Sequence, residues 1–155
     1  MNTDSKKSRI AAWLTVAVIA LAWAGNARAG APAGRYTLDT DTVVDTTNGL
    51  TWQRVAPTNM YTLADAKAYC AALSLGSIGV GGWRLPRKLE LETILDIDVY
   101  GPAIDVVAFP STPSSYFWTS SALIGSATTY YIVGFTEGYV NNGESSATYA
   151  VRCVH

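Results

Sequence analysis

The 155-residue chain is poor in the side chains that most enzymes use for chemistry. Only 15% of its residues are charged, it has two cysteines, and its single histidine is the last residue, His155. A general base at a chain terminus is hard to hold in place. No nucleophile elbow, metalloprotease helix or phosphate-binding loop occurs either. We therefore expect no enzymatic activity and no cofactor.

Long apolar runs are confined to the start of the chain. Residues 10–24 follow three basic residues and precede the small-x-small sequence of residues 27–29. This order is typical of a secretory signal peptide, and the run is shorter than the roughly 20 residues of a membrane-spanning helix. We predict a signal peptide over 1–29, with an uncleaved membrane anchor as the alternative. A linker over 30–39 and one exported domain over 40–155 would follow, periplasmic or extracellular.

Basic residues are scarce once that segment is removed. Residues 30–155 keep 11 − 4 = 7 basic and 12 − 1 = 11 acidic side chains, a net charge of −4. A nucleic-acid partner needs a basic stripe, and none is visible. The sequence therefore predicts no nucleic-acid partner, and after signal cleavage it has no further segment long enough to span a membrane.

The first half of the expected domain has clear turn and cap signals. Asn48-Gly49 predicts a β-hairpin over residues 42–54, because both residues tolerate a positive φ. A helix is predicted over 62–76, with Thr62 as its N-cap, Asp65 as capping-box partner and Gly76 at the C′ position. The hairpin and the helix begin an α+β domain.

The second half is predicted to contain a helix and several strands. The helix spans about 87–95, a loop-rich stretch covers 96–115, and a strand lies near 116–121. A hairpin over 128–140 should turn at Glu137-Gly138, and a last strand should cover 147–154. The whole predicts an antiparallel sheet with two helices and long loops.

The two cysteines both lie in the expected exported part, where oxidising conditions favour a disulfide. Cys70 falls on the apolar face of the helix predicted over 62–76. Cys153 falls on a plausible core face of the last strand. A disulfide would join the first helix to the last strand, and two free thiols are the alternative.

The stretch "GGWRLPRKLELETIL", residues 81–95, has the pattern of a turn that leads into a helix. Trp83 offers a large apolar anchor, and Leu85 is pushed towards an extended conformation by the proline that follows it. Pro86 suits the first helical position, N1. Arg84 carries five donors, and we expect it to tether loops rather than to do chemistry.

These residues resemble the Gly-x-x-Trp-Arg-Leu-Pro element of the Lcl C-terminal domain family, the module that ends the Legionella collagen-like adhesin. Three further segments agree in order: "TVVDTTNGLTWQR" with Trp52, "AFPSTPSSYFWTSS" with Trp118, and the terminal "YAVRCV". The resemblance implies a C-type-lectin-like fold shared with formylglycine-generating enzymes, in which a first-helix cysteine pairs with one in the last strand. No Gly-X-Y repeat precedes the domain here, and its acidic balance argues against a sulfated polysaccharide ligand.

A binding module for a glycan or a surface protein is the function that this resemblance favours. The candidate loops are 96–115 and 136–147, which are rich in tyrosine, serine, glycine and asparagine, a composition suited to adaptable contacts. Ordinary solvated turn residues are the alternative at each position. The predicted ligand-binding residues are Tyr116, Tyr139, Asn141, Asn142 and Glu144.

Three other functions are weaker alternatives. The segment 130–135 is apolar on both faces, which fits a buried strand or an interface in an envelope assembly. An enzyme related to the formylglycine-generating branch would need two reactive thiols. A calcium site could use carboxylates from either of two aspartate groups, but no matching ligand set accompanies them and we expect no metal. The two groups are Asp39, Asp41 and Asp45, and Asp96, Asp98 and Asp105.

Overall fold

The computed structural model describes residues 31–155, so the predicted signal peptide lies outside the described residues. The described chain contains strands and two short helices in the order β-β-β-α-α-β-β-β. Their bounds are β1 Tyr36–Leu38, β2 Thr42–Asp45, β3 Thr51–Gln53, α1 Leu63–Ala72, α2 Lys88–Glu92, β4 Tyr116–Ala122, β5 Thr129–Gly134 and β6 Tyr139–Glu144. The predicted α+β class is confirmed.

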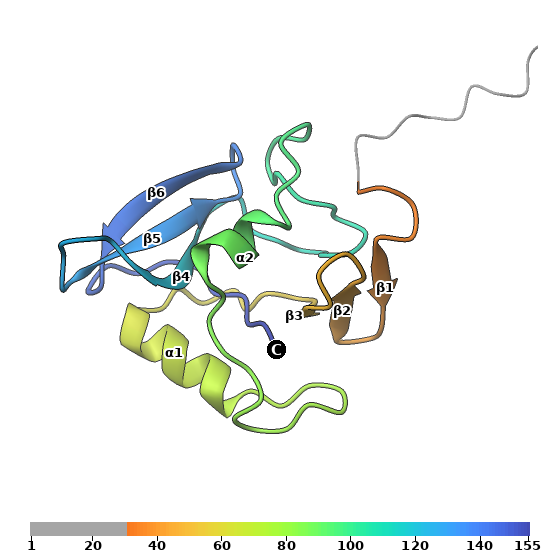
Figure 1. Ribbon diagram of the computed structural model, residues 1–155, viewed down its shortest axis with the longest axis horizontal. Helices are drawn as coiled ribbons and strands as arrows, with labels where there is room; N and C mark the ends of the chain where they lie inside the picture. Colours follow the sequence, from red (N-terminus) through yellow and green to blue (C-terminus); the bar gives the residue numbers. More distant parts are fainter. Residues whose placement is uncertain (1–30) are drawn as a thin grey trace, which may run out of the picture.

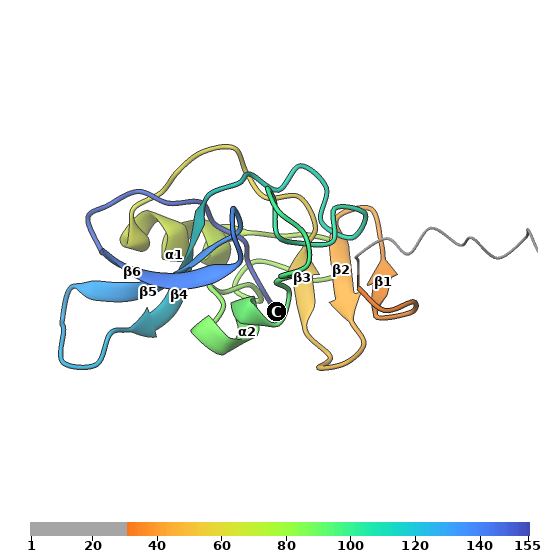
Figure 2. The ribbon, with the colours of Figure 1, turned by 90° about the horizontal axis from the view of Figure 1, so that it is seen from above.

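The strands form two antiparallel sheets, where the sequence analysis expected one. One sheet has the order β1-β2-β3 and the other has the order β4-β5-β6. Figure 1 shows them on either side of α2, with α1 below the β4-β5-β6 sheet. Figure 2 shows from above that the C-terminus lies between the two sheets.

The first sheet contains the predicted hairpin. β2 and β3 pair with Val43 opposite Trp52, and Gly49 in the turn has a φ of 74°. The sequence analysis missed β1, because its three residues fall in the segment that it treated as a linker. Tyr36 pairs with Asp45 there, and the Arg35 guanidinium lies 2.9 Å from the Asp45 carboxylate.

The second sheet extends into a predicted loop. Residues 136–147 were expected to be a binding loop, and that prediction is wrong for 139–144, which form strand β6. β6 pairs with all six residues of β5. The hairpin turn still falls where it was predicted, with Gly138 at a φ of 76°. Asparagine and glycine are poor strand formers, so β6 depends on its neighbour β5 more than on its own propensity.

β5 is the central strand, and its two faces pack into different parts of the core. Ile132 belongs to a cluster around the disulfide and α1, and Val133 belongs to a second cluster that α2 and both sheets share. Both side chains are at most 1% exposed. The apolar character of both faces is therefore that of a buried strand.

Helix α1 begins as predicted and ends early. Thr62 is the N-cap, and its Oγ1 accepts the Asp65 N–H at 3.3 Å. The helix ends at Ala72 because Leu73 is extended, with ψ at 141°. Gly76 has a positive φ but lies in the loop beyond, so its prediction as the C′ residue is wrong.

Helix α2 is shorter than the predicted range 87–95. Arg87 is its N-cap, so Pro86 precedes the helix and does not occupy position N1. Pro86 is buried, and its carbonyl accepts the Ser120 N–H of β4 at 2.8 Å. This hydrogen bond joins the segment before α2 to the second sheet. The helix therefore begins after Arg87, its N-cap.

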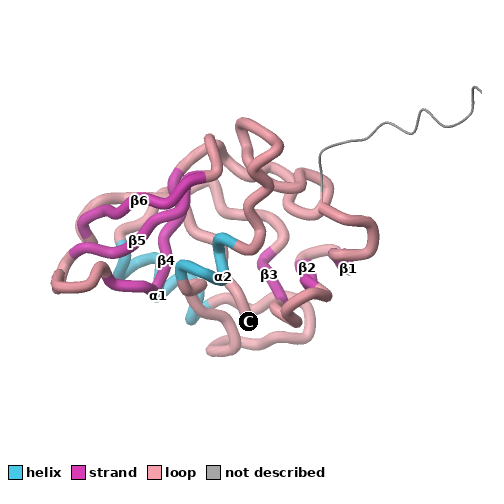
Figure 3. The backbone as a smooth tube through the Cα atoms, turned by 45° about the horizontal axis from the view of Figure 1, so that its top comes forward, coloured by secondary structure: helices cyan, strands magenta, loops and turns pink. Residues whose placement is uncertain are grey.

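The long loop between α2 and β4 has no helix or strand of its own, as predicted for residues 96–115. Figure 3 shows in pink that loops make up much of the described chain. Two buried side chains, Ile104 and Phe109, anchor this loop in the core. The loop is therefore packed, although it has no regular hydrogen-bond ladder.

The last segment is not the regular strand predicted over 147–154. Ala150 forms a parallel bridge to Phe117, whereas Val154 bridges both Trp52 and Arg84. All five residues from 150 to 154 are buried, because the segment runs between the two sheets and has neighbours on every side.

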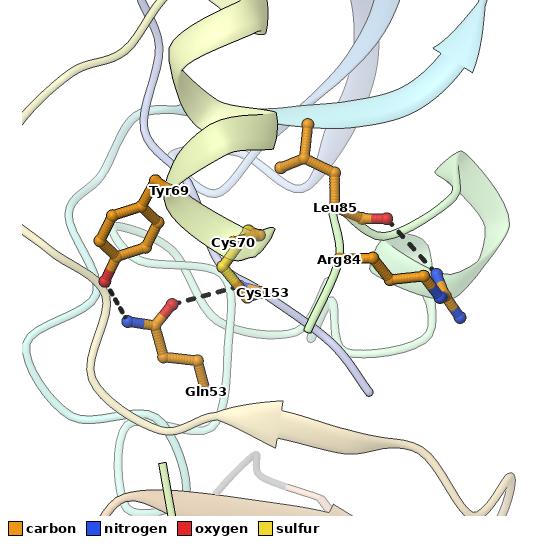
Figure 4. The surroundings of a disulfide bond; sticks show 6 residues. All are labelled: Gln53, Tyr69, Cys70, Arg84, Leu85 and Cys153. Carbon is orange, nitrogen blue, oxygen red and sulfur yellow. Dashed lines mark hydrogen bonds between the residues drawn. A yellow bond between two sulfur atoms is a disulfide. The ribbon is translucent and has the colours of Figure 1, made fainter. Parts of the chain in front are cut away.

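The predicted disulfide is confirmed. Cys70 of α1 and Cys153 of the last segment are bonded, with their Cα atoms 5.5 Å apart. Figure 4 shows a polar chain beside the bond. The Tyr69 hydroxyl accepts the Gln53 side-chain N–H at 2.7 Å, and the side-chain oxygen of Gln53, Oε1, accepts the Cys153 backbone N–H at 3.2 Å. The disulfide and this chain together tie α1, β3 and the C-terminal segment into one unit.

Candidate functional site

Three tyrosines form a row that runs from the surface towards the core, and we call Tyr139, Tyr116 and Tyr149 the tyrosine row. The ring centroids of Tyr139 and Tyr116 are 5.7 Å apart and those of Tyr116 and Tyr149 are 6.0 Å apart, both edge to face. Tyr149 then packs at 4.8 Å on Trp118, which is fully buried. β6, β4 and the last segment each contribute one tyrosine, so only the folded chain assembles the row.

The outer end of the row is the exposed part. Tyr139 is 41% exposed, and its hydroxyl is hydrogen-bonded to the hydroxyl of Tyr116. That bond raises the pKa of Tyr139 above its ordinary value, with desolvation acting in the same direction. This end of the sheet thus offers an aromatic ring with polar oxygens.

A glycine makes room for the inner end of the row. A Cβ atom on Gly143 of β6 would lie 2.6 Å from Cε2 of Tyr149, which real Cβ atoms essentially never do. Trp118 and Tyr116 hold the Tyr149 ring from two other sides, so the ring has little space to move away. Glycine at position 143 is thus a condition for this tyrosine packing.

The other predicted ligand residues divide between the two faces of β6. Side chains alternate along a strand, so Tyr139 and Asn141 share one face, whereas Asn142 and Glu144 lie on the other. The Asn141 Oδ1 accepts the Asn142 N–H at 2.8 Å, and a Glu144 oxygen accepts the Thr129 hydroxyl at 2.8 Å. The structure therefore brings Tyr116, Tyr139 and Asn141 together and places Asn142 and Glu144 elsewhere.

The loop over 96–103 meets the β5–β6 turn next to Tyr139. The Gly101 N–H donates to the Thr136 carbonyl at 3.0 Å, and Ile97 lies against Gly138. Ile97 is 78% exposed and Tyr100 is 73% exposed. The two candidate loop regions therefore lie side by side, with apolar and aromatic side chains at the surface.

A cavity of about 350 Å³ lies elsewhere, between the segment after residue 30 and the loop that follows α2. Arg35 and three of the aspartates weighed as calcium ligands, Asp96, Asp98 and Asp105, are among its lining residues. Asp96 accepts the Asp98 N–H and Asp105 accepts the N–H groups of Val107 and Ala108, as turn-capping carboxylates do. Among residues 31–155, no group of three potential metal ligands is placed to hold an ion.

The Trp-Arg-Leu-Pro stretch is occupied by structural contacts. Trp83 is buried beside the disulfide cluster, and Arg84 forms two hydrogen bonds with the Glu90 carboxylate. The Arg84 backbone exchanges both of its hydrogen bonds with Val154. Trp52 is fully buried in the core that both sheets share. These residues hold loops together and leave little for a ligand.

The most unusual buried residue is one that the sequence analysis overlooked. Arg152 is fully buried, and its Nη1 donates to the carbonyls of Gln53 and Arg54, each at 2.6 Å. Its Nη2 donates to the Thr112 hydroxyl at 2.7 Å, and its guanidinium lies 4.7 Å from the ring centre of Phe109. Burial lowers the pKa of Arg152 to about 9. This value is still above neutral pH, so the guanidinium remains charged there. The sequence signal that could have indicated a buried arginine is its position within the apolar run "AVRCV", residues 150–154.

These features define a small α+β domain with two antiparallel sheets, one disulfide and an aromatic row at the end of one sheet. The chain belongs to the Lcl C-terminal domain family, whose sequence model matches residues 41–155. No curated protein matches the chain. In residues 31–155 no helix is long and apolar enough to cross a membrane.

Proposed function

We propose that this protein is an exported, non-enzymatic binding module of the adhesin type, which recognises a glycan or a surface protein through the tyrosine row. The observation that carries the proposal is the half-exposed Tyr139 ring, held edge to face by Tyr116 at the end of a rigid sheet. A tyrosine combines a large apolar face with a hydroxyl, which suits contact with sugar rings and with protein side chains. Membership of the Lcl C-terminal domain family supports an adhesin-like role.

The scaffold that we propose is C-type-lectin-like, in which stable sheets display the recognising surface. The bond between the first helix and the last segment supports this scaffold. The acidic balance of residues 30–155, 7 basic against 11 acidic, favours a ligand without a dense negative charge. Among glycans we therefore favour neutral ones over sulfated ones.

The enzyme and the envelope-subunit alternatives both lose support from the packing. An enzyme of the formylglycine-generating kind would need reactive thiols, and both cysteines are bonded to each other. The envelope-subunit hypothesis depended on the two apolar faces of residues 130–135, and the interior of this domain covers those faces at Ile132 and Val133. Binding through the tyrosine row is the function that we retain.

A glycan array and a pull-down from surface extracts, both with the exported protein, test the proposal. We expect Tyr139→Ala to lose binding at least about tenfold, because a truncated interface aromatic commonly has that effect. Tyr139→Phe should keep most of it, since the ring remains. Val80→Ala is the control, because Val80 is an exposed apolar residue on the loop after α1 and outside the row, and this variant should bind like the wild type. Absence of any ligand in both screens, or equal losses in Tyr139→Ala and Val80→Ala, would overturn the proposal.

A further inference from the structure

Figures 1 and 2 show that the turn between β4 and β5 projects from the molecule, and we call this turn the hairpin tip. Ile124 at this tip is 93% exposed, more than any other large apolar residue of the described chain. The chain has no charged residue between Asp105 and Glu137, so the tip lies in the middle of a long uncharged stretch. A single exposed apolar side chain is common on protein surfaces, so the residues around Ile124 decide whether the tip is an interaction site.

The tip is a preformed turn. The Ser126 N–H donates to the Leu123 carbonyl at 3.0 Å, and Gly125 has a φ of 84°, as the third residue of a type II turn has. The Ser126 hydroxyl oxygen also accepts the Thr129 N–H at 3.0 Å. Ile124 is thus presented at the second turn position without further ordering of the backbone.

A tyrosine and a lysine lie on each face of the sheet just below the tip. Tyr130 and Tyr131 are adjacent residues of β5, so their side chains point to opposite faces. The Lys67 ammonium lies 5.1 Å from the ring centre of Tyr130, and the Lys88 ammonium lies 5.3 Å from that of Tyr131. An apolar tip above a belt of tyrosines and lysines is the arrangement that proteins use at the surface of a lipid bilayer.

We propose that this hairpin tip, residues 122–128, docks on a phospholipid surface. Ile124 enters the boundary between headgroups and acyl chains, the two tyrosines lie at the level of the headgroups, and the Lys67 ammonium contacts lipid phosphates. Lys88 contributes less, because Glu92 lies 3.5 Å from its ammonium group. The Glu144 carboxylate beside Thr129 adds a negative charge below the tip, so the attachment depends on apolar insertion more than on net charge.

This site is independent of the tyrosine row. Tyr139 pairs with Gly134 at one end of β5, whereas Thr129 at the other end adjoins the tip. A domain attached through its tip would therefore present the tyrosine row away from the membrane.

Tryptophan fluorescence tests the docking. The protein is used as the cell produces it, and its mass is measured first to identify its N-terminus. Trp52, Trp83 and Trp118 are at most 2% exposed, so Ile124→Trp adds an exposed reporter to residues 31–155. With phosphatidylcholine vesicles containing one quarter phosphatidylglycerol, we expect its emission to shift to shorter wavelength. Val80→Trp, at a position 73% exposed on a distant loop, is the matched control and should not shift. No shift in Ile124→Trp, or equal shifts in both variants, would overturn the proposal.

Vesicle sedimentation gives a second measurement without an added tryptophan. We expect Ile124→Ser to lower the partition coefficient about tenfold, since burial of one isoleucine contributes that order of affinity, and Val80→Ser to leave it unchanged. Tyr139→Ala should bind vesicles like the wild type, so loss of glycan binding and loss of membrane docking can be told apart. An Ile124-dependent protein complex in the absence of vesicle binding would show that the tip is a protein contact and would overturn the lipid proposal.

Discussion

The guanidinium of Arg84 faces the carboxylate of Glu90 side on, with Nη1 2.7 Å from Oε2 and Nη2 2.9 Å from Oε1. The same carboxylate accepts the backbone N–H of Arg87 at 2.7 Å, at the start of α2. Two parallel hydrogen bonds fix orientation as well as distance. Glu90 therefore holds the Arg-Leu-Pro turn against the helix that follows it.

Replacing Glu90 by glutamine should destabilise the domain by about 1 kcal/mol or less at pH 7, because the pair is partly exposed to solvent. The hydrogen bond from Arg84 keeps the pKa of Glu90 below its ordinary value, although burial acts the other way. A lowered pKa gives stability that is present above about pH 4.5 and is lost as the pH falls through the folded-state pKa. Urea unfolding of wild type and Glu90→Gln should thus differ at pH 7 and converge in acid.

Glu92→Gln is the control for this prediction, since its contact with Lys88 is a single longer one at 3.5 Å and should contribute less. A difference between wild type and Glu90→Gln that stayed constant down to pH 2 would contradict the assignment to an ion pair.

Removal of the disulfide should have the largest effect on stability. The bond closes a separation of 83 residues, for which the chain-entropy description gives about 4 to 5 kcal/mol. We expect the double variant Cys70→Ser with Cys153→Ser to be largely unfolded at 37 °C by circular dichroism. The native wild type should show no thiol that reacts with Ellman's reagent. Two reactive thiols per chain in the native protein would contradict the bond.

Arg152→Met should lower the free energy of unfolding by about 2 to 3 kcal/mol. The substitution removes a buried charge but leaves two carbonyls and the Thr112 hydroxyl without their donors. Thr112→Val removes one acceptor and should cost about 1 kcal/mol. Denaturant unfolding measures both variants. A variant Arg152→Met as stable as the wild type would mean that the cost of burying the charge cancels these bonds.

Gly143→Ala should disturb the tyrosine row while the rest of the fold persists. The added methyl group would meet the Tyr149 ring, so we expect a loss of about 1 to 3 kcal/mol and a change in the near-ultraviolet circular dichroism of the tyrosines. Gly79→Ala is the matched control, because a Cβ there has no atom within 4 Å. Equal effects of the two substitutions would contradict the role assigned to Gly143.

Local signals predicted local structure well in this chain. Asn48-Gly49 marked a real turn, and Thr62 caps α1, because both depend on backbone conformation within a few residues. Signals that depend on distant partners failed. Asn141 and Asn142 have low strand propensity and were expected in a loop. They form part of β6 because their backbones pair with β5.

The binding surface stays a prediction from composition, and the structure shows an arrangement of its residues that the sequence did not predict. Tyrosines and asparagines in residues 136–147 indicated a contact surface, but strand alternation separates Asn142 and Glu144 from Tyr139. Tyr149 could not be foreseen in the row, because its place depends on where the last segment crosses β4.

The sequence by itself determined the family, the α+β class, the turns, the start of the first helix and the two cysteines available for a bond, since each of these follows from motifs or from residues close together in the chain. Only the tertiary structure decided that there are two sheets, that Arg152 is buried among carbonyls, and that Tyr139, Tyr116 and Tyr149 touch. Those outcomes depend on contacts between segments as far apart as Gln53 and Arg152, whose packing no local pattern encodes.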